Sequence, residues 1–138
     1  MTKAGIKRTL GRVDELDRML TVIDARIERL ESMTQGHAIR YDAIRVQSTP
    51  EDPVEKAMEK LYGLLGKRKK LEVARMTALE EADALIDLVE DAKMKQVLCF
   101  RYLSGLSWYA VSKRLGYSEN WVFKLHDRAI DEILKKSQ

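Results

Sequence analysis

A small group of residues near the end of the chain has the types and spacing needed to read the edges of DNA bases. Phe123 and Lys124 follow Asn120 by three and four residues, so on a helix the three side chains share one face. Asn120 can form paired hydrogen bonds with adenine, Lys124 can reach guanine or a phosphate, and Phe123 can contact a thymine methyl group. Ser118 precedes them, where a hydroxyl and the first N–H groups of a helix suit a phosphate. We therefore expect Ser118, Asn120, Phe123 and Lys124 to form a base-reading surface.

Other residues close by in the sequence are suited to the sugar–phosphate backbone, which cations, aromatic hydroxyls and indoles contact without reading sequence. They are Trp108, Tyr109, Lys113, Arg114 and Arg128. Each has a plainer alternative, because Trp108 and Trp121 would equally well pack in a small core and the cations would be stable as solvated charges. Glu119 and Asp127 would repel phosphate, unless they accept a hydrogen bond from a cytosine amino group.

Three short helices are needed to position these residues, and the sequence marks their ends. A first helix is expected over 93–103, closed by Ser104 and Gly105, and a second over 108–115, capped by Ser107. Gly116 and Tyr117 form a turn, and Ser118 caps a third helix that runs to about residue 135.

The second and third of these helices fit a helix-turn-helix. A small residue is needed where the helices cross, and Ser112 is there; a residue that tolerates positive φ is needed in the turn, and Gly116 is there. The expected core positions hold Val111, Leu115, Tyr117, Val122 and Leu125, and the inward positions of the third helix hold Val122, Leu125, Ala129 and Ile133.

The charge of the chain also favours this end as a polyanion-binding region. Residues 92–138 contain nine Lys or Arg residues against four acidic residues, whereas acids slightly outnumber bases in residues 1–91. A positive field on the C-terminal third would attract nucleic acid.

Residues 1–90 are expected to form an arm of two long helices, over about 4–34 and 53–89, joined by a linker over 35–52. The first helix carries a heptad pattern of apolar residues: Val13, Leu16, Leu20, Ile23, Ile27 and Leu30. Gly36 is expected to end it, with room in the linker for a short helical turn around Ala43. Asp52, Pro53 and Glu55 mark the start of the second helix. Folded back as an antiparallel hairpin, the pair leaves an apolar stripe for a second copy of the chain or for the C-terminal unit.

The expected fold is therefore all-α, with a long antiparallel helical hairpin over 1–90 that serves as a dimerisation arm. A trihelical helix-turn-helix domain over 91–138 follows it. The chain has only two prolines and seven glycines, and it lacks the alternating β-branched and aromatic runs of strands.

The stretch QVLCFRYLSGLSWYAVSKRLGYSENWVFKLHDRAIDEI resembles region 4 of bacterial sigma factors in its RYL, GLS and LGYS elements. Behind a helical arm in so short a chain, it is similar to phage-encoded transcriptional regulators of the RinA and ArpU types. The resemblance implies a phage or prophage regulator of transcription that binds duplex DNA, with RNA polymerase as a further candidate partner. Residues 1–90 do not resemble the promoter-melting region of a complete sigma factor.

The residue inventory argues against an enzyme. The sequence lacks a Gly-rich phosphate loop, paired Cys or His residues at ligand spacing, and a nucleophile–His arrangement, so we expect no cofactor and no metal. It also lacks a secretory signal and an apolar stretch of about 18–20 residues, so we expect a cytoplasmic protein without a membrane partner.

Three classes of function remain open. The first is a sequence-specific transcriptional regulator that binds double-stranded DNA as a homodimer through its N-terminal helices. The second is a DNA-packaging protein of the small terminase kind, which also joins a helix-turn-helix to oligomerisation helices. The third is a protein-interaction module with a degenerate DNA-binding head, an alternative that Glu119 and Asp127 support.

Overall fold

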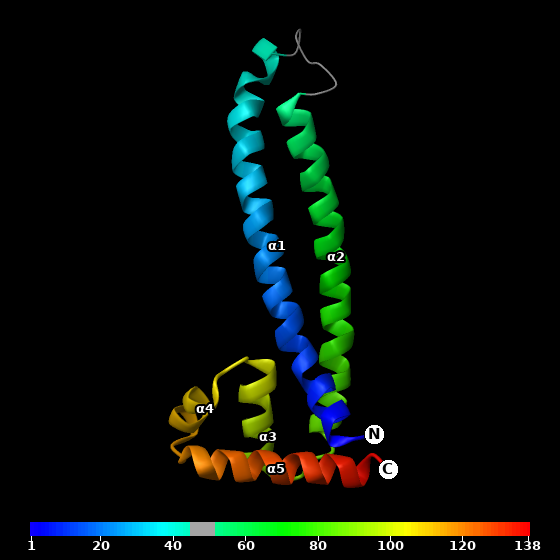
Figure 1. Ribbon diagram of the computed structural model, residues 1–138, viewed down its shortest axis with the longest axis vertical. Coiled ribbons are helices and arrows are strands. Elements are labelled where there is room, and N and C mark those ends of the chain that lie inside the picture. Colours follow the sequence, from blue (N-terminus) through cyan, green and yellow to red (C-terminus); the bar gives the residue numbers. More distant parts are fainter. Residues whose placement is uncertain (45–51) are drawn as a thin grey trace. The chain divides into compact units, whose positions relative to one another are not determined.

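A computed structural model describes the backbone of residues 1–44 and 52–138 and the side chains of residues 1–34 and 52–138. In chain order the helices are α1 (Lys3–Ile44), α2 (Pro53–Ile86), α3 (Ala92–Leu98), a π-helical segment (Cys99–Leu103), α4 (Trp108–Leu115) and α5 (Glu119–Lys136) (Figure 1). Residues 1–44 and 52–138 contain no strand, which confirms the all-α prediction. None of the helices in these two ranges is long and apolar enough to cross a membrane.

The described chain divides into two compact units. Unit 1 consists of Met1–Asp17 and Ala74–Gln138, and unit 2 consists of Arg18–Val73. This division differs from the predicted boundary at residue 90, because the first turns of α1 and the last turns of α2 belong to the same unit as the three short helices. The residues that position the candidate interface are therefore drawn from both ends of the chain.

Helix α1 is longer than its sequence signals indicate. It continues beyond the predicted end at residue 34 to Ile44, so the prediction of a linker that begins at residue 35 is wrong for residues 35–44. Gly36 lies within the helix and does not end it. A glycine inside a helix costs only about 1 kcal/mol, which continued helical hydrogen bonding on both sides can offset. The remaining linker residues up to Glu51 lie outside the described residues.

The start of α2 agrees with the sequence signals. Asp52 Oδ1 accepts a hydrogen bond from the Val54 N–H at 2.9 Å, and Pro53 is the first helical residue. Proline suits this position because its missing N–H would have had no helical partner. The helix ends at Ile86, slightly before the predicted end at residue 89.

Within unit 2, α1 and α2 pack through the heptad residues of α1. Ile23 and Ile27 form a buried cluster with Leu64 of α2. An Asp24–Arg68 ion pair of 2.6 Å lies beside that cluster, and an Asp17–Arg75 ion pair joins the same two helices in unit 1. Asp24 lies seven residues after Asp17 on α1, whereas its partner Arg68 lies seven residues before Arg75 on α2. The two helices therefore run in opposite directions. The heptad pattern is therefore used, at least in part, within one chain.

In unit 1, α3, α4 and α5 enclose a small core. Val97, Val111, Val122 and Leu125 form its buried centre. Leu98, Ile130 and Ile133 are also buried, but they are not members of that cluster. One contact joins α5 to the start of α1, Lys3 Nζ–Asp131 Oδ1 at 2.7 Å. Two join it to the segment between α2 and α3: Lys136 Nζ to the Leu88 carbonyl at 2.9 Å, and Glu90 N–H to Glu132 Oε1 at 3.3 Å.

The division into units makes a prediction about stability. Ile6 is fully buried and lies in unit 1, as do both tryptophans. Ile6→Ala should therefore lower the free energy of unfolding of unit 1 by about 2–5 kcal/mol, which tryptophan fluorescence in a urea titration would report. Val22→Ala, at a position 60 % exposed in unit 2, is the matched control and should leave the transition in place. An unchanged transition for Ile6→Ala would instead support a domain boundary near residue 90.

Candidate nucleic-acid interface

The ends of α4 and the start of α5 lie where the sequence signals placed them. Ser107 Oγ accepts a hydrogen bond from the Ala110 N–H at 3.1 Å and caps α4, and Ser118 Oγ accepts one from the Trp121 N–H at 3.2 Å and caps α5. Gly116 ends α4 in the left-handed conformation, with φ 72° and ψ 29°. A side chain would be strained at this φ, so glycine allows the short connection between the two helices.

Ser112, the small residue predicted for the crossing of α4 and α5, is buried. It is only 4 % exposed, and its hydroxyl donates to the Tyr109 carbonyl at 2.7 Å. Its own carbonyl accepts the N–H groups of Gly116 and Tyr117, so the turn is closed by backbone hydrogen bonds.

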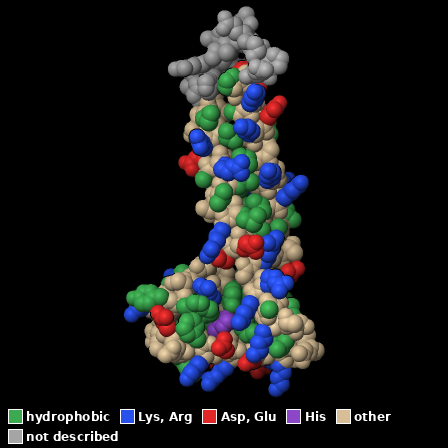
Figure 2. Space-filling view, viewed as in Figure 1, with side chains coloured by type: hydrophobic (Ala, Val, Ile, Leu, Met, Phe, Trp, Pro, Cys, Tyr) green, Lys and Arg blue, Asp and Glu red, His purple; other side chains and the backbone are tan. Residues whose placement is uncertain are grey.

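Helix α5 has one buried and one exposed face, as the periodicity predicts. The predicted inward residues Val122, Leu125, Ala129 and Ile133 are all buried. The predicted outward residues Asn120, Phe123, Lys124 and Asp127 are all exposed. Figure 2 shows Lys and Arg side chains along this helix, with acidic side chains among them. The structure thus brings the base-reading candidates together at the start of α5, with the hydroxyl of Ser118 next to them.

Trp108 and Phe123 link the two helices of the candidate interface. Their rings meet edge to face with centroids 5.1 Å apart, and Trp108 makes a second such contact with His126 at 4.8 Å. The Arg101 guanidinium lies 4.5 Å from the centre of the same indole. Trp108 is half-buried among these groups, which agrees with the predicted alternative of packing in a small core.

The three cations proposed for phosphate contact are exposed, and each lies over an aromatic ring. Lys113 Nζ is 5.3 Å from the centre of the exposed Tyr109 ring, one helical turn away. The Arg128 guanidinium lies 5.3 Å from the Trp121 ring. Each such cation–π contact restricts a long side chain and stabilises the protein by about 0.5–1 kcal/mol at an exposed site. Tyr109 and Lys113 therefore share one side of α4.

Arg114 lies on a different side of α4. Its guanidinium is 5.5 Å from the ring of Phe100, which belongs to the π-helical segment. The structure therefore does not gather all the phosphate candidates in one cluster. They flank the start of α5 on α4 and along α5 itself.

The acidic residues of α5 are partly compensated by groups that sequence spacing does not reveal. Asp131 is paired with Lys3, from the first turn of α1, and this pairing raises the pKa of the lysine. Asp127 Oδ1 lies 3.3 Å from His126 Nδ1. Glu119 occupies the first turn of α5, where the helix dipole favours an acid. Lys3 gave no sequence signal because almost the whole chain separates it from Asp131.

His126 is a buried structural residue beneath this surface. It is 4 % exposed, and its Nε2 is 2.6 Å from the Tyr102 hydroxyl. Burial lowers the pKa of His126, and the nearby cations Lys7 and Arg101 act in the same direction, although Asp127 opposes them. The imidazole is therefore neutral near neutral pH and serves to hold the π-helical segment against α5.

This shift predicts a dependence of stability on pH. When the pH falls below 6.5, the usual pKa of histidine, the unfolded chain gains a proton that the folded chain resists. The free energy of unfolding should therefore decrease between about pH 7 and about pH 5, and His126→Gln should flatten that dependence. Urea titrations across this range would measure it. His37→Gln, a change of the only other histidine, is the control; a flattening by that variant alone would contradict the assignment.

The comparisons with known proteins give no family for the chain. No family model, no curated protein and no solved structure matches it.

Proposed function

We propose that this chain is a double-stranded DNA-binding regulator of transcription that reads base edges with the start of α5. The observation that carries the proposal is that α5 has one buried apolar face and one exposed polar face. The inner face of α5 is buried, while Asn120 and Lys124 project from its first turns directly after a tight turn. A helix presented in this way can enter the major groove with its N-terminal residues. The resemblance to sigma region 4 and to phage regulators supports the same function.

Base and phosphate contacts would be divided between α5 and its surroundings. Asn120 would bond adenine, and Lys124 would reach guanine or phosphate. Phe123, 38 % exposed and held by Trp108, has a limited area left for a thymine methyl group. Lys113, Arg114 and Arg128 would contact phosphates, and their number sets how strongly salt weakens binding.

Self-association is the second part of the proposal. On α2, Met58, Tyr62, Leu65 and Met76 are exposed, with Tyr62 at 65 % and Met76 at 57 %. The first three are spaced by four and three residues, so they share one stripe of the helix. A second copy that covers this stripe would give a dimer with two reading helices, the number that two half-sites require.

The exposed acidic residues of α5 favour one alternative function, the binding of a protein partner. Asp127 has a side chain 73 % exposed, and Glu119 is exposed at the start of α5, where either would repel a phosphate. A surface with such acids suits a protein partner, and RNA polymerase is a candidate within the leading proposal. A small terminase-like packaging protein would require a larger ring, which the oligomeric mass distinguishes from a dimer.

Separate variants should distinguish base reading from phosphate contact. Asn120→Ala should cost about 1–3 kcal/mol on the preferred duplex and little on random DNA. Lys113→Ala should weaken both duplexes about equally and lower the salt slope by about one unit. The preferred duplex would come from selection in a random library, followed by titrations at several salt concentrations.

Matched controls exist for both changes. Gln96→Ala removes an exposed amide from α3, and Lys56→Ala removes an exposed cation from α2; neither should alter DNA affinity. If neither Asn120→Ala nor Lys113→Ala changes the affinity of a folded protein, α5 serves a protein partner and the leading proposal is wrong.

The apolar stripe of α2 gives a test of self-association. Tyr62→Glu combined with Leu65→Glu should raise the dimer dissociation constant by about tenfold or more, because charge would replace buried apolar contacts. Sedimentation at several concentrations would measure it. Ala84→Glu, at an exposed position of the same helix, should leave the dimer intact. A wild-type protein that is monomeric at high micromolar concentration would refute this part of the proposal.

A further inference from the structure

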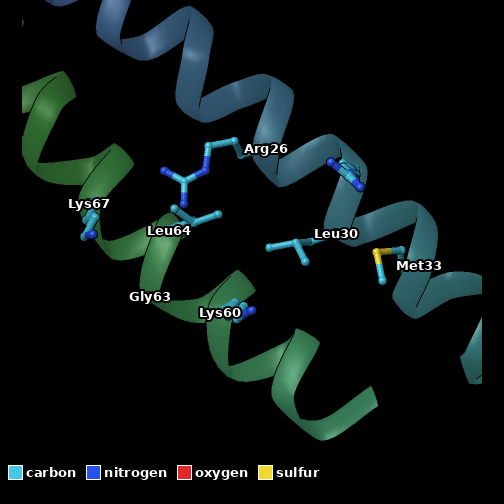
Figure 3. A pocket seen from close by; sticks show the side chains of 8 residues that line it. Arg26, Leu30, Met33, Lys60, Gly63, Leu64 and Lys67 are labelled. Atoms are coloured by element: carbon cyan, nitrogen blue, oxygen red, sulfur yellow. The ribbon is translucent and has the colours of Figure 1, made fainter. Parts of the chain in front are cut away.

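An open groove lies between α1 and α2 within unit 2, and it belongs to neither the DNA-binding candidates nor the apolar stripe of α2. Its volume is about 570 Å³. Figure 3 shows Arg26 and Leu30 projecting from α1 toward α2, where Leu64 lies. The groove therefore runs along the contact between the two helices.

Four cations line the groove, and no acid does. They are Arg26, Arg29, Lys60 and Lys67. All four are exposed, and in the described part of the chain none of them forms an ion pair, whereas the neighbouring Arg68 pairs with Asp24 and Glu72. Like charges this close repel one another, so an anionic occupant would relieve a cost that the isolated chain bears.

The floor of the groove is apolar. Leu30, Met33 and Leu64 line it, and Gly63 leaves the backbone of α2 without a side chain there. A Cβ atom at Gly63 would meet nothing within 4 Å, so the space above it is open. The exposed Met19 and Val22 precede Arg26 and Arg29 at alternating spacings of three and four residues, which extends this surface along α1.

These features favour one kind of occupant. A phosphate backbone would use the cations but would gain nothing from covering methionine, valine and leucine side chains. An α-helix is about 10–12 Å across, and two packed helices offer a third helix a groove of matching width. An apolar stripe on that helix would cover the floor, and acids beside the stripe would meet the cations.

We propose that this groove binds an acidic amphipathic helix of a protein partner. The binding would be separate from DNA recognition and does not depend on it. The apolar floor would supply most of the affinity, and the cations would supply orientation and the rate of association.

A designed peptide provides the probe. It would be about three heptads long, with Leu at positions a and d and Glu at e and g, and the control peptide would have Lys in place of Glu. Calorimetry with the full chain should give one acidic peptide per chain, with affinity that falls as salt is added, and binding of the Lys peptide should be weaker by about tenfold or more. Equal binding of both peptides, or no binding of the acidic one, would overturn the proposal.

Two glycines of α2 make a matched pair of variants. Gly63 lines the groove and Gly66 does not, and a Cβ at either meets nothing within 4 Å. Gly63→Trp should fill the groove and lower the affinity for the acidic peptide by about tenfold or more. Gly66→Trp should change that affinity by less than about twofold. If Gly63→Trp fails to fold, Lys67→Glu and Lys69→Glu provide the same comparison by a change of charge. Only Lys67 lines the groove, so only Lys67→Glu should lower the affinity for the acidic peptide.

The same variants identify a different occupant. If Gly63→Trp weakens binding of duplex DNA while Gly66→Trp does not, the groove contacts nucleic acid and the proposal is wrong. If Gly63→Trp converts a wild-type dimer into a monomer, the groove holds a second copy, which also overturns it. Unchanged DNA affinity and unchanged mass, together with loss of peptide binding, would support the acidic partner helix.

Discussion

The burial of one face of α5 is the constraint on which the candidate interface depends. Val122 and Leu125 pack in the core of the three short helices, and Ile130 and Ile133 are buried further along the same helix. Once these positions are inward, the 3.6-residue period leaves Asn120 and Lys124 no orientation except outward. The exposed chemistry therefore follows from the apolar residues beneath it and from the Ser118 cap that fixes where the helix starts.

The two ends of α5 are stabilised in different ways. Its first turns pack against α4 through the edge-to-face contact of Trp108 and Phe123. Its last turns are joined to the beginning of α1 by Lys3 and to the segment after α2 by Lys136. Since surface ion pairs contribute about 0–1 kcal/mol each, the buried apolar residues supply most of the stability and the pairs supply orientation.

The features that the sequence predicts correctly are local ones. Ser107 caps the start of α4 and the left-handed Gly116 ends it, and each acts through a hydrogen bond to a residue within about one turn of itself. The contacts that it misses join distant residues: Tyr102 meets His126, and Lys3 meets Asp131, with no pattern that would pair them. The predicted end of α1 failed for another reason, because the weak helix preference of Gly36 was outweighed by its helical neighbours. Local signals thus specify the helices, while the packing decides which surfaces remain exposed.

Two arginines of α2 help to fix how that helix lies along α1. Arg68 and Arg75 each form an ion pair with an aspartate of α1. If α2 slipped along α1, both arginines would lose their aspartate partners, and because these side chains are more than one third exposed each loss would cost about 0–1 kcal/mol. The two pairs therefore favour this register of α1 and α2 by a small amount. Within unit 2, the Asp24–Arg68 pair also helps to keep Arg26 and Arg29 of α1 on the same groove as Lys60 and Lys67 of α2.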